Sequence, residues 1–196
     1  MARAQRSDAC RNRERLLECA AEAFAVHGVD APLEKIAKSA CVGIGTLYRH
    51  YPTRDALVEA VYRHNVDQLC AGAEELRATL PPDEALAEWM QRFVSYVASK
   101  KGLATYLRSV VSVDSELFTE AKGRVHDTIS GLIADAVAAG SIRPDVDPQD
   151  VIHTLGGFCL MNDVNSDPEQ GRRVARLLMD GLRYGAHAPS PVGATG

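Results

Sequence analysis

An all-α fold is predicted for this chain of 196 residues. Apolar residues recur at helical spacing along nearly the whole sequence, and no segment shows the alternation of a half-buried strand. Aromatic residues make up only 6% of the chain, whereas alanine is abundant, which favours helices packed through small and aliphatic side chains. The chain is long enough for one large domain or two small ones.

The first two helices follow from an apolar stripe and a proline. A helix is predicted over residues 11–28, because its apolar side chains share one face and Gly28 suits the C-terminal cap. Pro32 suits the first position of a short second helix, where its missing N–H has no partner to lose.

A third short helix and a long fourth one come next. Residues 41–43, "CVG", interrupt the helical pattern, and "IGTLYRHY" resumes it until Pro52 ends it. Thr53 then caps a long helix predicted over residues 54–80.

The rest of the chain also reads as helices separated by turn signals. Gly140 ends one helix, and the pairs Asp147-Pro148 and Asp167-Pro168 each cap and start another. The tail from residue 188 is rich in Pro, Gly and Ala and is predicted to be mobile. The helices predicted here cover residues 83–100, 101–113, 115–140, 148–161 and 168–186.

The tight turn at 41–43 between two short helices has the spacing of a helix-turn-helix unit. A small core is predicted to clamp the two helices at a steep angle, and small residues permit the close crossing. The residues of the third helix that point away from this core form a face that fits a DNA major groove. The predicted core comprises Ile36, Ala37, Ala40, Val42, Leu47 and Tyr51, and the outer face Gly45, Thr46, Tyr48, Arg49 and His50.

Gly43 and Gly45 are explained by the same hypothesis. Their missing side chains let the start of the third helix approach phosphates or base edges closely. Tyr48, Thr46 and His50 are able to donate hydrogen bonds to phosphates, and Arg54 adds a positive charge.

The stretch "IAKSACVGIGTLYRHYPTRDALVEAVY" closely resembles the DNA-binding segment of the tetracycline-repressor (TetR) family of bacterial transcriptional regulators. The match spans about residues 12–62, and "AGSIRPDVDPQDVIHTLGGF" resembles a connector and helix common in such proteins. By this resemblance, base-reading positions fall on Ile44, Gly45 and Tyr48. Phosphate-contacting positions fall on Thr46, Tyr48, His50 and Arg54.

The resemblance also implies a domain organisation. Residues 1–62 are expected to bind DNA, and a long helix joins them to a larger helical domain, residues 63–187, that binds an inducing ligand and forms a homodimer. Residues 188–196 are expected to form a flexible tail.

One position departs from the family pattern, because Cys41 stands where Gly is usual in the turn. If Cys41 adopts a left-handed conformation, its side chain costs about 1 kcal/mol. We interpret Cys41 as a small apolar filler, and a redox-sensing thiol stays open as the alternative.

Charge is divided unevenly along the chain. The net charge of −4 argues against a uniformly basic nucleic-acid binder, yet residues 1–64 carry +2 and the remainder −6. Five arginines near the N-terminus fit either a solvated basic surface or an arm that follows DNA and is disordered without it. They are Arg3, Arg6, Arg11, Arg13 and Arg15.

Several other classes of protein are disfavoured. The five cysteines form no CxxC pair, and the six histidines show no metal-binding spacing, so neither a metal nor a cofactor is expected. There is no nucleophile–base pair and no phosphate loop, hence no catalytic residue is assigned. The sequence has no signal peptide and no apolar run long enough to span a bilayer, so a cytoplasmic location without membrane contact is expected.

A ligand pocket is predicted on the inward faces of the central helices, where a few polar and aromatic groups lie among aliphatic ones. Plain core packing explains many of these residues equally well. The predicted pocket residues are Trp89, Phe93, Tyr96, Tyr106, Val110, Phe118, His126, Ile129, Phe158, Met161 and Asn162.

The last two helices are predicted to pair with the same helices of a second subunit, which builds a four-helix interface. Gly156 and Gly157 would permit close approach, and internal core is the alternative. The predicted interface residues are Val151, Leu155, Cys159, Val174, Leu177, Leu178 and Leu182.

Together these observations predict a homodimeric, ligand-responsive transcriptional regulator, expected to be a repressor that a small molecule releases from a palindromic double-stranded operator. An activator is the alternative within the same class, because the position of the operator in the promoter decides between repression and activation. An α-helical enzyme or small-molecule carrier that uses the central pocket is the alternative from another class. The amino-acid sequence identifies neither the effector nor the operator.

Overall fold

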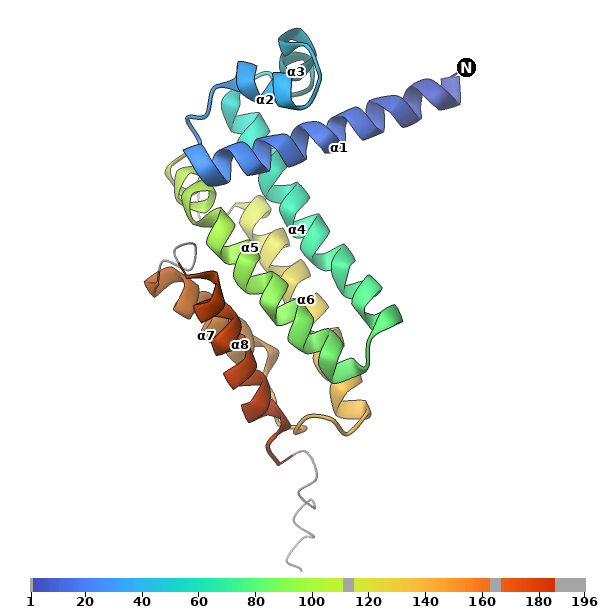
Figure 1. Ribbon diagram of the computed structural model, residues 1–196, viewed down its shortest axis with the longest axis vertical. Coiled ribbons are helices and arrows are strands. Elements are labelled where there is room, and N and C mark those ends of the chain that lie inside the picture. Colours follow the sequence, from blue (N-terminus) through green and yellow to red (C-terminus); the bar gives the residue numbers. More distant parts are fainter. Residues whose placement is uncertain (1, 111–114, 163–166, 186–196) are drawn as a thin grey trace, which may run out of the picture. The chain divides into compact units, whose positions relative to one another are not determined.

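This computed structural model describes residues 2–110, 115–162 and 167–185. Within these ranges all regular structure is helical, as the sequence predicts (Figure 1). The helices are α1 (Ala2–His27), α2 (Leu33–Ser39), α3 (Ile44–His50), α4 (Arg54–Thr79), α5 (Pro82–Val110), α6 (Glu116–Ala138), α7 (Pro148–Met161) and α8 (Pro168–Arg183).

The chain divides into two compact units. Unit 1 comprises Met1–Gln68 and Ser99–Ala121, and unit 2 comprises Leu69–Ala98 and Lys122–Gly196. Helices α4, α5 and α6 each contribute residues to both units.

In unit 1, α1 packs on α2 and α2 packs on α3 (Figure 1). Leu16 and Phe24 of α1, Ile36 of α2 and Leu47 of α3 are buried, which removes the apolar stripe of each short helix from water. Thr53 caps α4 as predicted, since its Oγ1 accepts from the N–H of Ala56 at 3.1 Å.

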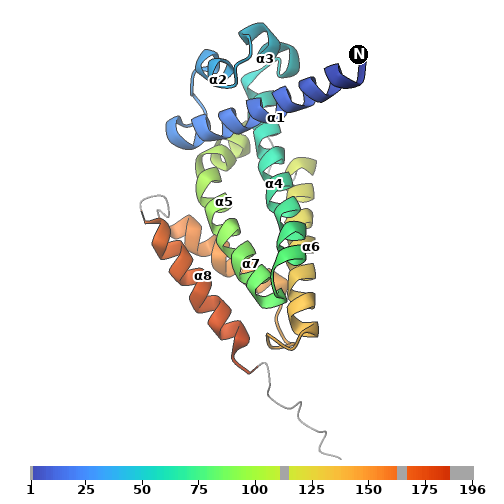
Figure 2. The same cartoon turned by 45° about the vertical axis from the view of Figure 1, so that its right-hand side comes forward.

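In unit 2, α7 and α8 lie side by side (Figure 2). Asp147 and Asp167 cap these helices as the sequence predicts, because their carboxylates accept from the N–H groups of Gln149 and Gln170. Arg183 at the end of α8 donates to the carboxylate of Asp83 in the first turn of α5, with Nε 3.0 Å from Oδ2.

Three differences from the predicted boundaries exceed two residues. Helix α1 begins at Ala2, so the disorder expected of a basic arm without DNA is wrong. Residues 2–27 contain neither Gly nor Pro to stop the helix, and whether the arginines follow DNA stays a prediction. The predicted helices 83–100 and 101–113 form one helix, α5, because Gly102 weakens a helix without ending it. Helix α8 ends at Arg183 and not at residue 186, and the predicted flexible tail lies outside the described residues.

Candidate nucleic-acid interface

The turn between α2 and α3 is closed by two backbone hydrogen bonds at the end of α2. The N–H of Cys41 donates to the carbonyl of Lys38 at 3.0 Å, and that of Val42 donates to Ala37 at 2.9 Å. This pattern is a Schellman motif, which requires a left-handed residue in the position of Cys41. Cys41 has φ 56°, so the fold bears the free-energy cost of placing a residue with a side chain in the left-handed conformation.

Helix α3 has one buried side chain, Leu47, and Tyr51 directly after it is buried too. The opposite face is open: Tyr48 is 46% exposed, Gly45, Arg49 and His50 are exposed, and Thr46 is half-buried. Ile44 at the start of α3 is also exposed. Of the predicted core residues, Ile36, Ala37, Ala40, Leu47 and Tyr51 are buried, whereas Val42 is half-buried.

Nothing inside the protein demands glycine at positions 43 and 45. Gly43 has φ −71°, which any residue adopts, and a Cβ there would meet only Thr46 Oγ1 at 4.0 Å. A Cβ on Gly45 would meet no atom within 4 Å. Because glycine lowers helix stability, its place on an exposed helix face has no internal benefit. Gly45 therefore leaves room for a molecule outside the chain, whereas Gly43 is the N-cap of α3, where glycine is a common residue.

Two arginines of α1 donate hydrogen bonds to the residues that follow α2 and α3. Arg15 Nε donates to the carbonyl of Ala40 at 2.8 Å, and Arg13 Nε donates to the hydroxyl of Tyr51 at 3.3 Å. From the sequence, both arginines were interpreted as part of a basic N-terminal surface or a DNA-following arm. No local pattern predicts these hydrogen bonds, because their acceptors lie 25 and 38 residues away along the chain.

Arg54 has an internal role that the sequence did not indicate. Its Nη1 donates to the carbonyl of Val29 at 2.5 Å and to that of Ala31 at 2.8 Å. The first residue of α4 thus holds the turn between α1 and α2. A phosphate contact from Arg54 requires that it share its guanidinium between this turn and DNA.

Asp55, next to Arg54, accepts a hydrogen bond from the hydroxyl of Tyr106 on α5 at 2.6 Å. This hydrogen bond raises the pKa of Tyr106 above its ordinary value, because the neighbouring carboxylate favours the protonated phenol. Tyr106, predicted to line a ligand pocket, therefore joins α5 to the start of α4 within unit 1.

The other predicted pocket residues are distributed over both units. Trp89, Phe93 and Ile129 are buried in unit 2, where the indole N–H of Trp89 donates to the carbonyl of Leu69 and its ring stacks on Phe93. Val110 and Phe118 belong to unit 1. Tyr96, His126, Phe158 and Asn162 are half-buried in unit 2.

Two of these pocket predictions are wrong about the face. Val110 is 47% exposed and Met161 is 88% exposed, so neither lies on an inward face. Helix α7 buries Val151, Leu155 and Cys159. Met161 follows Cys159 by two residues, a rotation of about 200° around the helix, and therefore points away from that stripe.

The predicted interface residues also separate into two groups. Val151, Leu155, Cys159 and Leu182 are buried within the chain itself, so they are internal core and not an open surface. Leu177 is 73% exposed, and Val174 and Leu178 are half-buried. The inner stripe of α8 runs instead through Ala175, Met179 and Leu182.

Among the described residues, no group of three or more His, Cys, Asp and Glu side chains is arranged to hold a metal ion. No helix in the described part of the chain is both long and apolar enough to cross a membrane.

Comparison with known proteins agrees with this geometry. Residues 16–61 match bacterial regulatory proteins of the tetR family, and residues 81–184 match the C-terminal domain of SbtR-like transcriptional regulators. The chain is 28% identical over 142 residues to the transcriptional repressor KstR2 of Mycolicibacterium smegmatis, with 69% of each protein covered.

Two solved structures are similar along nearly the whole chain. The TetR transcriptional regulator SCO0520 from Streptomyces coelicolor is 40% identical, with a TM-score of 0.81 and 87% of this chain and 98% of that chain covered. The TetR regulatory protein from Mycobacterium vanbaalenii is 35% identical, with a TM-score of 0.74 and 91% and 99% covered. The open α3 face thus lies within a matched DNA-binding segment, and the chain belongs to the TetR family of bacterial transcriptional regulators.

Proposed function

We propose that two copies of this chain bind a palindromic operator and repress transcription until a small molecule releases them. The observation that carries the proposal is the exposed face of α3. Tyr48 is exposed there, and no internal contact requires that residue 45 be glycine. The similarity of the chain to the repressor KstR2 supports repression over activation.

On this proposal Ile44, Gly45 and Tyr48 meet base edges, Thr46, Tyr48 and His50 contact phosphates, and Arg49 lies on the same DNA-facing surface. Arg54 acts mainly by holding the turn at Val29 and Ala31, which fixes α1 against α4. A phosphate contact from the same guanidinium is part of the proposal.

A dimer is proposed because one α3 helix reads too few bases for tight, specific binding. Exposed apolar side chains support α7 and α8 as the contact: Leu160 and Met161 on α7, and Leu177 on α8. A Cβ on Gly156, Gly157 or Gly181 would meet nothing within 4 Å, which leaves room for close approach of a partner helix.

Release by an effector requires that the ligand prefer the state that cannot bind DNA. We propose that it lodges near the aromatic row of Trp89, Phe93 and Tyr96 on α5, where consecutive ring centroids lie 5.4 and 6.0 Å apart. Helix α4, which has residues in both units, would carry the displacement toward α3. A regulator that binds the operator shares a compartment with the chromosome, so a cytoplasmic location is part of the proposal.

The decisive experiment is a selection of random DNA duplexes for those that the purified protein retains. The expected result is a palindrome whose half-sites are centred about 10 base pairs apart or a multiple of that, because two α3 helices must enter major grooves about 34–36 Å apart. Recovery of no consensus, or of a consensus without two-fold symmetry, would contradict the proposal.

A further inference from the structure

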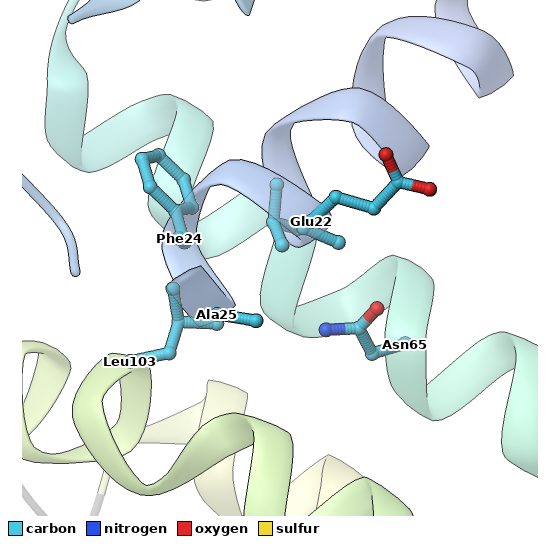
Figure 3. A pocket seen from close by; sticks show the side chains of 7 residues that line it. Glu22, Phe24, Ala25, Asn65 and Leu103 are labelled. Atoms are coloured by element: carbon cyan, nitrogen blue, oxygen red, sulfur yellow. The ribbon is translucent and has the colours of Figure 1, made fainter. Parts of the chain in front are cut away.

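Unit 1 contains a half-open cavity of about 230 Å³ that is remote in sequence from the α3 face. Helix α1 supplies most of its wall, and α4 and α5 complete it (Figure 3). None of its lining residues belongs to the set predicted for the effector. The residues that carry the argument are Glu22, Phe24 and Ala25 of α1, Val61 and Asn65 of α4, and Leu103 of α5.

The cavity as a whole has a volume comparable to that of one ring with a short substituent. Phe24, Val61 and Leu103 line it with buried side chains. An apolar cavity of about 150 Å³ accommodates benzene, so the larger volume here has room for a ring and a few further atoms.

The polar groups lie together at one side of the cavity. Figure 3 shows Glu22 and Asn65 on the side away from Phe24, with the exposed Glu22 carboxylate extending outward from α1. Within the described part of the chain, the Glu22 side chain has neither an ion pair nor a hydrogen bond.

The surroundings of Glu22 are negative. Glu18 and Glu22 lie four residues apart along α1, a spacing at which like charges destabilise a helix. Burial raises the pKa of the Cys19 thiol, the charges of Glu22 and Glu18 raise it further, and the charge of Arg15 partly offsets them. A bound cation would relieve the repulsion, whereas a bound anion would add to it.

We propose that this cavity binds a small organic cation, an amine carried on one aromatic or aliphatic ring. The ring lies against Phe24, Val61 and Leu103, the ammonium faces Glu22, and the Asn65 amide oxygen accepts one of its hydrogen bonds. The site belongs to the DNA-binding unit and is therefore distinct from the effector site of the proposed function.

The test uses three probes of the same shape on the full chain without DNA: benzylamine, benzyl alcohol and benzoate. Backbone amide shifts in ¹H–¹⁵N spectra are expected to move at Ala25, Asn65 and Leu103, with benzylamine binding most tightly and benzoate least. Equal binding of the three probes, or shifts confined to other residues, would overturn the proposal.

Two variants assign the site. Ala25 is exposed, so Ala25→Leu fills the cavity without loss of fold and is expected to abolish benzylamine binding, whereas Ala71→Leu, at an exposed alanine of α4, should not. Glu22→Gln is expected to weaken benzylamine binding by up to about fivefold, the upper end of the range for an exposed ion pair, and to leave benzyl alcohol binding unchanged. Glu34→Gln on α2 is its control.

Operator binding is measured separately, so a failure here leaves the proposed function standing, and the reverse holds too.

Discussion

The hydroxyl of Tyr106 lies 2.6 Å from a carboxylate oxygen of Asp55, and this hydrogen bond joins α5 to the first turn of α4. It raises the pKa of Tyr106 above the ordinary value of 10.0. The protonated phenol is therefore favoured in the folded state, and its stabilisation is present below pH 10 and lost as the pH rises through the folded pKa.

Tyr106→Phe tests this contact. The variant is expected to be less stable than the original chain at pH 8 by under about 1 kcal/mol, because the pair is exposed to solvent. The difference should shrink as the pH passes above 10. Denaturant titrations of both proteins at pH 8 and above 10 measure it, and a difference independent of pH would exclude the hydrogen bond as its cause.

Tyr48→Ala is expected to reduce operator affinity at least tenfold without lowering the melting temperature. Tyr48 is 46% exposed and lies on the open face of α3, where substitutions change stability by about 0.5 kcal/mol or less. Fluorescence anisotropy with a labelled operator measures affinity, and Val26→Ala, at a 75% exposed residue of α1, is the control. Full retention of affinity would remove Tyr48 from the interface.

Gly45→Ala is expected to change stability and DNA binding in opposite directions. Alanine favours a helix over glycine by about 1 kcal/mol, and the new Cβ meets nothing within 4 Å, so the melting temperature should rise. The same methyl group would separate α3 from DNA and weaken operator binding. Gly123→Ala on α6, where a Cβ also has open space, should raise stability and leave affinity unchanged. Unchanged affinity in Gly45→Ala would refute close approach at this position.

Cys41→Gly is expected to stabilise the protein by about 1 kcal/mol, because Cys41 has φ 56° and glycine adopts that conformation without strain. Cys41→Ala keeps a Cβ and should give no such gain. Chemical denaturation of the three proteins checks the order. If the thiol is a filler only, operator binding by the original chain should respond to reducing and oxidising conditions no differently from that of Cys41→Gly, which lacks the thiol.

Leu177→Asp is expected to convert a dimer into a folded monomer and to weaken operator binding. Leu177 is 73% exposed, so a charge there does not disturb the core of its own chain. Sedimentation velocity at micromolar concentration measures the change, and Val26→Asp, at a 75% exposed site on α1, should leave the assembly intact. A monomeric original chain would contradict the two-fold mechanism itself.

The arrangement of α2, α3 and their turn could be predicted because its signals are local. A break at residues 41–43, a proline at 52 and a threonine cap at 53 act through hydrogen bonds and sterics within a few residues. The interpretation of Arg54 as only a phosphate contact was incomplete for the opposite reason, since Ala31 is 23 residues away.

Helical periodicity was a weaker guide to which face of a helix is open. It correctly marked α7 and α8 as amphipathic but assigned Val151, Leu155 and Cys159 to a partner surface, although all three are buried in their own chain. Apolar spacing shows that a stripe avoids water and does not show which neighbour covers it.

The sequence by itself determined the helical class, most helix limits and the exposed face of α3, because backbone preferences and capping act over one or two turns. Only the tertiary structure decided the roles of Arg15, Arg54 and Tyr106 and the cavity beside Glu22. Those roles depend on partners distant along the chain, and packing alone brings such residues within hydrogen-bond distance.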